Sequence, residues 1–295
     1  MATLAGAADR AGCEHGRVNT RIERLKVCLN GGRSREDHPA VPLTPAELAA
    51  SAAAAVEAGA EAVHLHPRGP DGSESLRAAD IAAAVTAVRQ ECPDTPVGVS
   101  TGLWITGGDP AARRSEVAAW AALPAAGRPD FASVNLSEPG WEELWGVLAS
   151  AGIAAEAGIW SMADVGRLAA AGQAASWLRI LVEIINVPAA RAVAAADEIL
   201  HRLGELNTTI PPLLHGEGPA CWPLIAHAGT LGLPTRIGLE DTAAGPDGSA
   251  VSGNAELVRL ALRTWTASRE RQPLSVATVP WPASSPAPGP APADL

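Results

Sequence analysis

Residues 44–68, TPAELAASAAAAVEAGAEAVHLHPR, join one helix to one strand, and this junction decides the fold. Thr44 suits the N-terminal cap of a helix, and Glu47 stands three residues later, where it can complete a capping box. Gly59 ends the helical pattern, and the short apolar run 62–66 follows almost at once. A helix that leads straight into a strand is typical of parallel sheets, because successive parallel strands need a crossover between them.

The same unit recurs along the chain. Short apolar runs occur near residues 25–30, 62–66, 96–100, 131–136, 154–160, 178–184, 211–215 and 235–239. Each is followed by a helical pattern, at residues 45–58, 77–91, 111–122, 141–151, 162–171, 189–203, 220–231 and 254–268, with Asn254 expected to begin the last one as its cap. Eight such units predict a (β/α)8 TIM barrel, a fold of about 250 residues. An open doubly wound sheet is the alternative, but the first turn, Asn30-Gly31-Gly32-Arg33, is not a dinucleotide-binding fingerprint.

The barrel accounts for most but not all of the chain. Residues 1–21 lack sustained apolar periodicity, so we expect a flexible N-terminal arm. Residues 22–278 hold the predicted catalytic barrel. Residues 279–295 are rich in Pro and Ala and cannot build a core, so we expect an extended tail.

Composition excludes several classes of partner. The formal charge of −10 argues against a nucleic-acid surface and against an anionic membrane. The sequence has neither a long apolar span nor a signal-peptide pattern, so we expect a soluble cytoplasmic protein. The four cysteines show no CxxC spacing, which favours buried free thiols over disulfides or a thiolate metal site: Cys13, Cys28, Cys92 and Cys221.

The run Glu61-Ala62-Val63-His64-Leu65-His66 carries the first chemical signal. Residues at positions i and i+2 of a strand lie on the same face, about 6.5–7 Å apart. His64 and His66 can therefore converge on one metal ion while Leu65 packs on the other side. A His-x-His pair on a strand is more often structural, so the metal interpretation depends on the surrounding residues.

Polar residues stand at the carboxyl ends of all eight expected strands. In chain order they are Asn30; His64 and His66; Ser100 and Thr101; Ser133 and Asn135; Glu156; Glu183; His215 and Glu217; and Arg236, Glu240 and Asp241. This end of the barrel is where chemistry takes place in such folds. A single Glu there would more often be solvated, but eight polar strand ends together indicate a site, because charges that face a barrel interior are costly unless paired or metal-bound.

The eighth strand supplies a third candidate ligand. Strands two and eight both flank strand one, and alternate strands contribute to the same interior layer, so Glu240 can face His64 and His66. Two His and one carboxylate suit Zn²⁺ with open positions, although Fe²⁺ favours the same set. Arg236 paired with Asp241 would keep that carboxylate ionised and oriented as a base. An Arg–Asp surface pair without a chemical role is the alternative.

Other strand ends offer weaker signals. The hydroxyls of Ser100 and Ser133 can donate hydrogen bonds to a substrate carboxylate or oxyanion. Asn30, Thr101 and Asn135 are further candidates for substrate contacts. The loop His215-Gly216-Glu217-Gly218-Pro219 opens a helix where barrels often bind phosphate, but Gly-rich turns of this kind are common for steric reasons alone.

Several motifs together resemble one family. They are Asn30-Gly31-Gly32, His38-Pro39-Ala40-Val41-Pro42-Leu43-Thr44-Pro45, His64-Leu65-His66-Pro67-Arg68, Ser100-Thr101-Gly102, Ala132-Ser133-Val134-Asn135, Arg236-Ile237-Gly238-Leu239-Glu240-Asp241 and Asn254-Ala255-Glu256-Leu257-Val258. The pattern is similar to that of the β-keto acid cleavage enzymes over about residues 25–268. The His-x-His and Arg-x-Gly-x-Glu-Asp motifs are specific in combination.

The resemblance implies a homotetrameric (β/α)8 barrel with one Zn²⁺ per chain, held by His64, His66 and Glu240. It implies a CoA-dependent reaction, in which a β-keto acid and acetyl-CoA give acetoacetate and a new acyl-CoA. Asp241, held by Arg236, would remove a C2 proton. The resulting enolate would attack the acetyl thioester, and CoA would then cleave the other side of the diketone.

The resemblance also assigns substrate contacts. Ser100 and Ser133 would hold the substrate, and Ser133 stands where the best-known members carry Thr. The acidic residue expected after Asn-Gly-Gly is Arg33 here, in a loop one residue shorter. We expect Arg33 either to pair with Glu156 and leave a neutral pocket, or to bind an anionic or hydroxylated tail of the substrate. Both predict a neutral or anionic β-keto acid rather than one with a primary ammonium; alternatively, Arg33 points to solvent.

Three other functions remain as alternatives. Barrel hydrolases also carry His-x-His, but on the first strand, with further His or Lys on strands five and six, where this chain has Glu156 and Glu183. A zinc aldolase or lyase without CoA would use much the same enolate chemistry. A non-catalytic metal or acyl-ligand sensor would not need Arg236 and Asp241 beside the metal.

Overall fold

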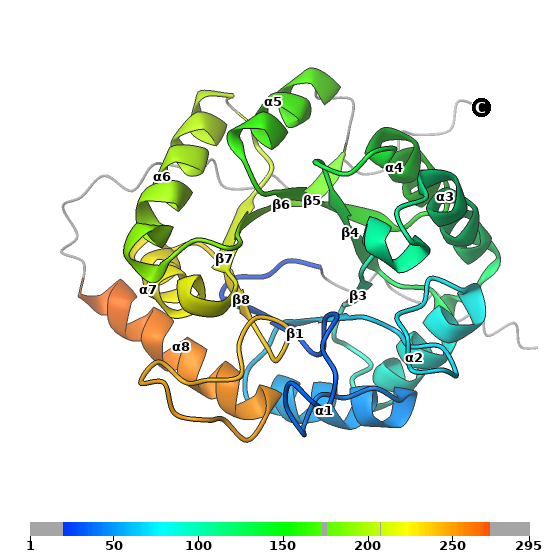
Figure 1. Ribbon diagram of the computed structural model, residues 1–295, viewed down its shortest axis with the longest axis horizontal. Coiled ribbons are helices and arrows are strands. Elements are labelled where there is room, and N and C mark those ends of the chain that lie inside the picture. The colour runs from blue at the N-terminus through cyan, green and yellow to red at the C-terminus, as the bar shows by residue number, and fades with distance from the viewer. Residues whose placement is uncertain (1–19, 173–175, 207, 272–295) are drawn as a thin grey trace, which may run out of the picture.

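The computed structural model describes residues 20–172, 176–206 and 208–271, and these form one barrel of parallel strands surrounded by helices (Figure 1). The strands are β1 (Leu25–Cys28), β2 (Ala62–Leu65), β3 (Val97–Val99), β4 (Phe131–Asn135), β5 (Ala154–Ile159), β6 (Trp177–Ile184), β7 (Pro212–Gly216) and β8 (Thr235–Ile237). The α-helices are α1 (Pro45–Glu57), α2 (Ala78–Glu91), α3 (Pro110–Ala118), α4 (Trp141–Ser150), α5 (Met162–Ala171), α6 (Ala189–Glu205), α7 (Cys221–Leu231) and α8 (Asn254–Glu270). The predicted (β/α)8 barrel is confirmed.

The strand order is β7-β6-β5-β4-β3-β2-β1-β8, so β7 and β8 are the two ends of the sheet. Two hydrogen bonds join these ends. Leu214 N donates to Pro234 O at 3.0 Å, and Thr235 Oγ1 donates to Leu214 O at 2.7 Å. The sheet is thereby nearly closed, and its carboxyl ends meet at one mouth.

Local signals in the sequence set the boundaries of α1. Thr44 and Glu47 form the expected capping box at the start of α1, and Gly59 follows the helix with φ +110°. The expectation for Asn254 is wrong, because it is the first residue of α8 and Gly253 occupies the cap. The Asn254 side chain instead accepts a hydrogen bond from Leu239 N at 2.8 Å and donates to a main-chain carbonyl beyond β1, so it joins the ends of β1 and β8.

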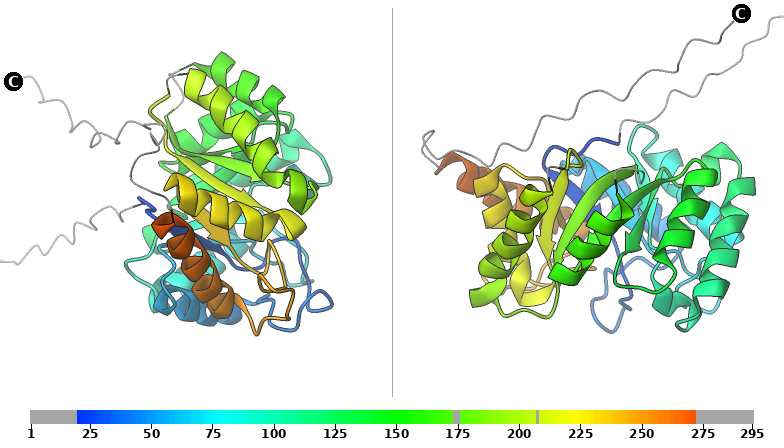
Figure 2. Two further views of the ribbon diagram at one scale, coloured as in Figure 1. Left: turned by 90° about the vertical axis from the view of Figure 1, so that its left-hand side faces the viewer. Right: turned by 90° about the horizontal axis from the view of Figure 1, so that it is seen from above.

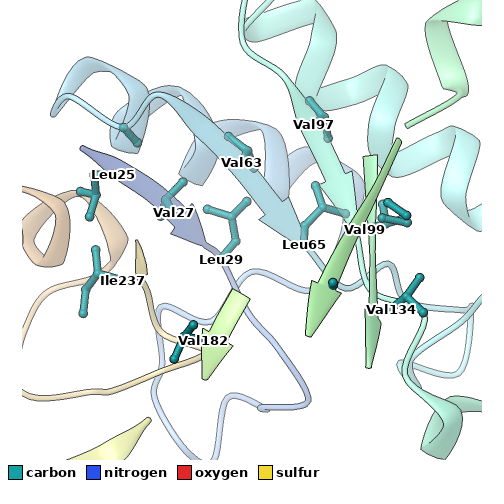
Figure 3. Close-up of a cluster of buried hydrophobic side chains, with 14 of the residues drawn as sticks. Leu25, Val27, Leu29, Val63, Leu65, Val97, Val99, Val134, Val182 and Ile237 are labelled. Carbon is teal, nitrogen blue, oxygen red and sulfur yellow. The ribbon is translucent and has the colours of Figure 1, made fainter. Parts of the chain in front are cut away.

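Alternate strand residues face the helices and build the apolar core. Leu25, Val27, Val63, Val99 and Ile237 are fully buried in one cluster (Figure 3). Each buried aliphatic side chain of this kind contributes about 1.5–3 kcal/mol. The side views show the helices covering the outside of the strands (Figure 2).

The barrel interior is polar below the mouth. Lys26 Nζ lies 2.7 Å from Glu156 Oε2, and Arg179 Nε lies 3.3 Å from Glu156 Oε1. Both cations lie over the Phe131 ring, at 5.7 and 5.4 Å from its centroid. A Cβ at Gly98 would lie only 1.9 Å from this ring, so the absence of a side chain there lets Phe131 fill the interior.

Some predictions concern residues that lie partly outside the described ranges. The predicted arm and tail lie there except for residues 20 and 21, as does Cys13. Cys28, Cys92 and Cys221 are buried free thiols, as expected. Within the described residues, no helix is both long and apolar enough to cross a membrane.

Candidate active site

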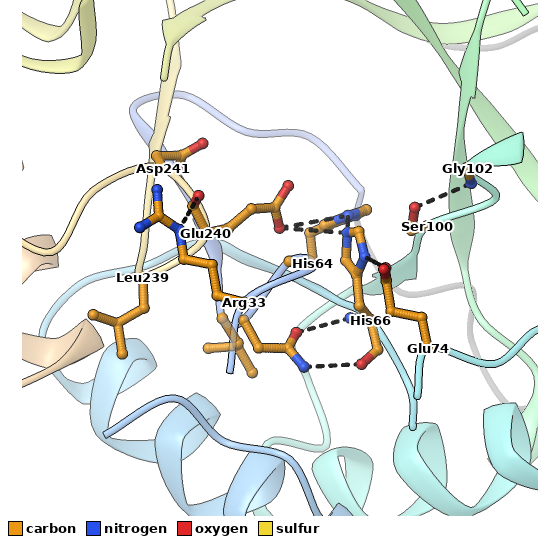
Figure 4. A network of polar contacts seen from close by, with 12 residues as sticks. Arg33, His64, His66, Glu74, Ser100, Gly102, Leu239, Glu240 and Asp241 are labelled. Carbon is orange, nitrogen blue, oxygen red and sulfur yellow. Dashed lines mark hydrogen bonds and ion pairs between the residues drawn. The ribbon is translucent and has the colours of Figure 1, made fainter. Parts of the chain in front are cut away.

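His64, His66 and Glu240 converge at the mouth of the barrel (Figure 4). His64 Nε2 lies 3.2 Å from His66 Nε2, and Glu240 Oε2 lies 3.9 and 3.5 Å from these two nitrogens. Both histidines are buried and Glu240 is nearly so. The three residues predicted as ligands therefore aim one atom each at a common point, which fits a tetrahedral ion with an open position.

The charge state of these groups supports a cation at this point. Burial, with the nearby His66, lowers the pKa of His64 well below its usual value, so its imidazole is neutral. Among the described residues, Glu240 Oε2 is buried without a hydrogen-bond partner. A neutral imidazole and an unpartnered carboxylate oxygen are the donors that Zn²⁺ or Fe²⁺ takes.

Asn30 fixes the backbone of His66. Its Oδ1 accepts from His66 N at 2.9 Å, and its Nδ2 donates to His66 O at 2.8 Å and to Pro42 O at 3.1 Å. The Asn30 amide is therefore fully engaged with main-chain groups. The sequence predicts a substrate contact for Asn30, but this geometry gives Asn30 a positioning role.

Glu74 fixes the ring of His66, and sequence reasoning missed it. Its Oε1 lies 2.5 Å from His66 Nδ1, and its Oε2 accepts from Trp104 Nε1 at 2.9 Å. Burial raises the pKa of Glu74, but the hydrogen bond and charge interaction with His66, the hydrogen bond from Trp104 and the charge of Arg68 together outweigh burial, so the pKa is lowered. An ionised Glu74 keeps the proton on Nδ1 of His66, so that Nε2 presents its lone pair to the cluster.

Arg236 holds the two acidic residues that follow β8. It donates to Asp241 Oδ1 from Nε at 3.0 Å and from a terminal nitrogen at 2.7 Å, and to Glu240 Oε1 at 2.9 Å. The strand ends at Ile237, two residues earlier than expected, and a turn closed by Asp241 N donating to Gly238 O at 2.9 Å follows. The turn lets consecutive residues reach one guanidinium, which a continued strand would not allow.

Asp241 has the properties of a base. It is fully buried, and its Oδ2 has no hydrogen-bond partner in the described part of the chain. Burial raises the pKa of Asp241 to about 7, against the opposing effect of Arg236. A carboxylate with a pKa near neutrality and one free oxygen is suited to abstract a proton.

The close approach of β8 to β1 explains the glycine in the Arg-x-Gly-x-Glu-Asp motif. A Cβ at Gly238 would lie 1.7 Å from the carbonyl oxygen of Cys28. Glycine at this position therefore lets the backbone pass β1 and bring Glu240 to the histidines.

The other side chains predicted to contact the substrate differ in whether they already make hydrogen bonds within the protein. Ser133 is partly exposed, and its hydroxyl makes no hydrogen bond within the described ranges. Ser100 Oγ accepts from Gly102 N at 3.2 Å, and Thr101 Oγ1 donates to Ser133 O at 2.5 Å. Asn135 Nδ2 donates to Glu138 Oε1 at 2.9 Å. Ser133 is thus the hydroxyl most open to a ligand, whereas Thr101 supports the β4 backbone.

Two predictions about Arg33 and Glu156 are wrong. Glu156 is not at the end of β5 but within it, neutralised in the interior by Lys26 and Arg179. Arg33 Nε donates to the main-chain oxygen of Glu240 at 3.0 Å, and a terminal nitrogen lies 3.9 Å from Glu217. The two residues do not pair, because Glu156 takes its cations from strands β1 and β6. The structure thus excludes the Arg33–Glu156 pair, whereas a neutral or anionic β-keto acid stays a prediction.

Comparisons with known proteins find one sequence family and relatives that match part of the chain. A sequence profile described as beta-keto acid cleavage enzyme matches residues 24–279. A 3-keto-5-aminohexanoate cleavage enzyme of Fusobacterium nucleatum is 39% identical over 69 residues, which is 23% of this chain and 25% of that one. A 3-oxoadipate:acetyl-CoA acetyltransferase of Cupriavidus necator is 39% identical over 79 residues, 26% of this chain and 28% of that one. The matched segments thus span about a quarter of the length of these curated relatives.

Solved structures share the fold at low identity. A ternary complex of ObcA with a C4-CoA adduct and oxalate has a TM-score of 0.64 at 18% identity, covering 82% of this chain and 67% of that one. The 3-hexulose-6-phosphate synthase of Salmonella typhimurium has a TM-score of 0.51 at 12% identity, and the match covers 83% of this chain and 99% of that one. These likenesses support the barrel and nothing finer.

Proposed function

Because this chain belongs to the beta-keto acid cleavage enzyme family, we propose that it converts a β-keto acid and acetyl-CoA into acetoacetate and a new acyl-CoA. Acetyl-CoA is the acyl donor in the name of the Cupriavidus necator relative, which supports the same co-substrate here. The observation that carries the proposal is Asp241, a buried carboxylate with a free oxygen and a pKa of about 7, one residue from Glu240.

Asp241 begins the reaction by taking a proton from C2 of the β-keto acid. The C2 carbanion attacks the acetyl carbonyl, a carbon–carbon bond forms, and CoA leaves as a thiolate. The thiolate attacks the original keto carbon, and the bond between that carbon and C2 breaks. The acyl group leaves on CoA, and the acetoacetate carbanion recovers the proton from Asp241, so protons and electron pairs balance.

Three further roles complete the proposal. Arg236 holds Asp241 in place through two hydrogen bonds to Oδ1, which leaves Oδ2 for the substrate. Ser133 and Ser100 would donate hydrogen bonds to the carboxylate of the keto acid. Burial of the site excludes water and strengthens each of these interactions.

His64, His66 and Glu240 would hold the metal, one ion per chain, for which we propose Zn²⁺. Such a cation supplies Lewis-acid stabilisation of the negative charge that develops on the keto oxygen. We further infer a cytoplasmic homotetramer whose partners are the keto acid and the CoA thioester; the formal charge of −10 disfavours nucleic acid and anionic membranes as partners.

Turnover of a panel of β-keto acids, with and without acetyl-CoA, tests this function. We expect a new acyl-CoA and acetoacetate, detected by mass spectrometry, only when acetyl-CoA is present. Cleavage of the keto acid without acetyl-CoA would instead identify a hydrolase or a CoA-independent lyase. Absence of both reactions in metal-loaded protein would contradict the proposal.

A further inference from the structure

Two buried polar side chains, Glu183 on β6 and His215 on β7, have no role in the proposed reaction. They are register partners near the carboxyl ends of their strands, and Glu183 Oε2 lies 3.6 Å from His215 Nε2. Their side chains are 8% and 1% exposed. Neither ring nitrogen of His215 has a hydrogen-bond partner in the part of the chain that the structure describes. Buried polar atoms are normally satisfied, so these nitrogens indicate a position for a ligand group or water.

Asn135, on the neighbouring side of the mouth, adds a third polar group. Its Nδ2 donates to Glu138, and the Arg113 guanidinium in turn binds Glu138. This orientation turns Asn135 Oδ1 toward Gly158 of β5. A Cβ at Gly158 would lie 2.6 Å from Asn135 Oδ1 and 3.3 Å from Glu183 Oε1. The missing side chain thus lets two acceptor oxygens from β4 and β6 approach the same point of β5.

The charges of Glu183 and His215 suit these residues to binding a ligand rather than to transferring a proton. Burial raises the pKa of Glu183, but His215, Arg236 and Lys26 outweigh it and hold the pKa at about 2. Burial, with Arg236, lowers the pKa of His215 to about 4. Near neutral pH the pair is therefore an anionic carboxylate beside a neutral imidazole. A carboxylate this acidic is a poor base but a strong hydrogen-bond acceptor.

The group borders the reaction centre. Arg236, which binds Asp241 and Glu240, also acts electrostatically on both Glu183 and His215. The ligand cluster comes from β2, the residue that follows it and the turn after β8, whereas this group comes from β4, β6 and β7. A keto acid placed with C2 at Asp241 can therefore extend its far end toward Glu183.

We propose that Glu183, His215 and Asn135 form the subsite for the substituent beyond the keto group, and that this subsite selects a substituent that donates hydrogen bonds, an ammonium or a hydroxyl. The inference rests on the proposed function, because it assigns part of the same substrate. An apolar substituent would leave the buried acceptors unpaired, and a carboxylate would meet Glu183, so both are rejected.

The test compares β-keto acids of equal length that end in an amino, hydroxyl, methyl or carboxylate group. We expect kcat/KM with acetyl-CoA to be at least about tenfold higher for the amino or hydroxyl acid than for the methyl acid. Glu183→Gln should lower the ratio of kcat/KM for the amino-substituted acid to that for the methyl acid at least about tenfold. The corresponding ratio for the hydroxyl acid should fall less, since only the ammonium loses an opposite charge. Glu205→Gln, at the exposed end of α6, is the control and should keep both ratios.

Binding measured without acetyl-CoA separates this inference from the proposed function. Ligand-observed NMR gives the dissociation constants of the four acids. In the wild type the amino or hydroxyl acid should bind more tightly than the methyl acid, and in Glu183→Gln this difference should disappear. His215→Gln is a second variant that should also lower the ratios and serves if Glu183→Gln does not fold. Equal ratios in wild type and variants, or preference for the methyl or carboxylate acid, would overturn the subsite. Donor-selective binding without acyl-CoA formation would overturn the proposed function and retain the subsite.

Discussion

Glu74 and His66 lie 2.5 Å apart, carboxylate oxygen to Nδ1, and this contact decides which nitrogen of the imidazole faces Glu240. The Glu74 carboxylate is in turn held by the indole of Trp104, whose ring lies stacked against His66 at 6.4 Å between centroids. An exposed residue of the short 3-10 helix after β3 is therefore connected to a candidate metal ligand through one carboxylate.

This contact predicts the effect of Glu74 on metal affinity. Glu74→Gln should weaken Zn²⁺ binding by about tenfold and Glu74→Ala by up to about 100-fold, because the ring of His66 loses its charged partner. Competition titration with a chromophoric chelator measures the affinity. Trp104→Phe keeps the stacking but not the indole N–H, so its loss should be smaller. Wild-type affinity in Glu74→Ala would show that Glu74 does not orient His66.

Purified protein should carry about one divalent metal ion per chain, most readily zinc. His64→Ala or His66→Ala should lose it, since each removes one of the three donors that converge there. Elemental analysis gives the stoichiometry, and His227→Ala, outside the cluster, is the control. Metal-free wild-type protein that added Zn²⁺ does not load would contradict the assignment.

Asp241→Asn should keep the metal but lower turnover by about 100- to 10,000-fold, because an amide cannot accept the C2 proton. Exchange of the C2 hydrogens in deuterated water, followed by NMR without acetyl-CoA, isolates the proton-transfer step from the later ones. A near-normal exchange rate in this variant would place the base elsewhere.

Gly98→Ala should destabilise the fold by about 1–3 kcal/mol, because its Cβ would overlap the Phe131 ring in the packed interior. Gly146→Ala is the matched control: it lies within α4 with open space around the added methyl, and it should stabilise by about 0.5–1 kcal/mol. Chemical denaturation of both variants gives the two free energies. Equal effects would mean that the interior accommodates the methyl group.

The capping box of α1 predicts a pH dependence of stability. Hydrogen bonds from the backbone of Thr44 and Leu43 lower the pKa of Glu47 from 4.5 to about 2. Ionised Glu47 therefore stabilises the fold above pH 4.5, and this contribution is lost as the pH falls toward about 2. Glu47→Gln should be less stable near neutrality and equal to wild type near pH 2. Because the carboxylate is partly exposed, we expect a small difference, within about 1 kcal/mol. Denaturation of both proteins across this pH range measures it, and a stability difference that stays the same at every pH would contradict it.

The sequence by itself determined the order of strands and helices and pointed to three side chains that the structure brings together, those of His64, His66 and Glu240. Apolar periodicity and local caps such as Thr44 with Glu47 act over a few residues, so they can be read without the fold. The His64–His66 pair was equally local, because the strand repeat puts both on one face.

Only the tertiary structure decided which charges meet. Glu156 finds Lys26 across 130 residues of sequence, Arg33 turns to Glu240 rather than to Glu156, and Glu74 folds back onto His66. Asn254 was expected to cap a helix but instead links β1 to β8. Periodicity tells which face of an element is buried, whereas ion pairs depend on the register between strands and on the path of the loops. Those are fixed only when the barrel closes and all eight strand ends come together.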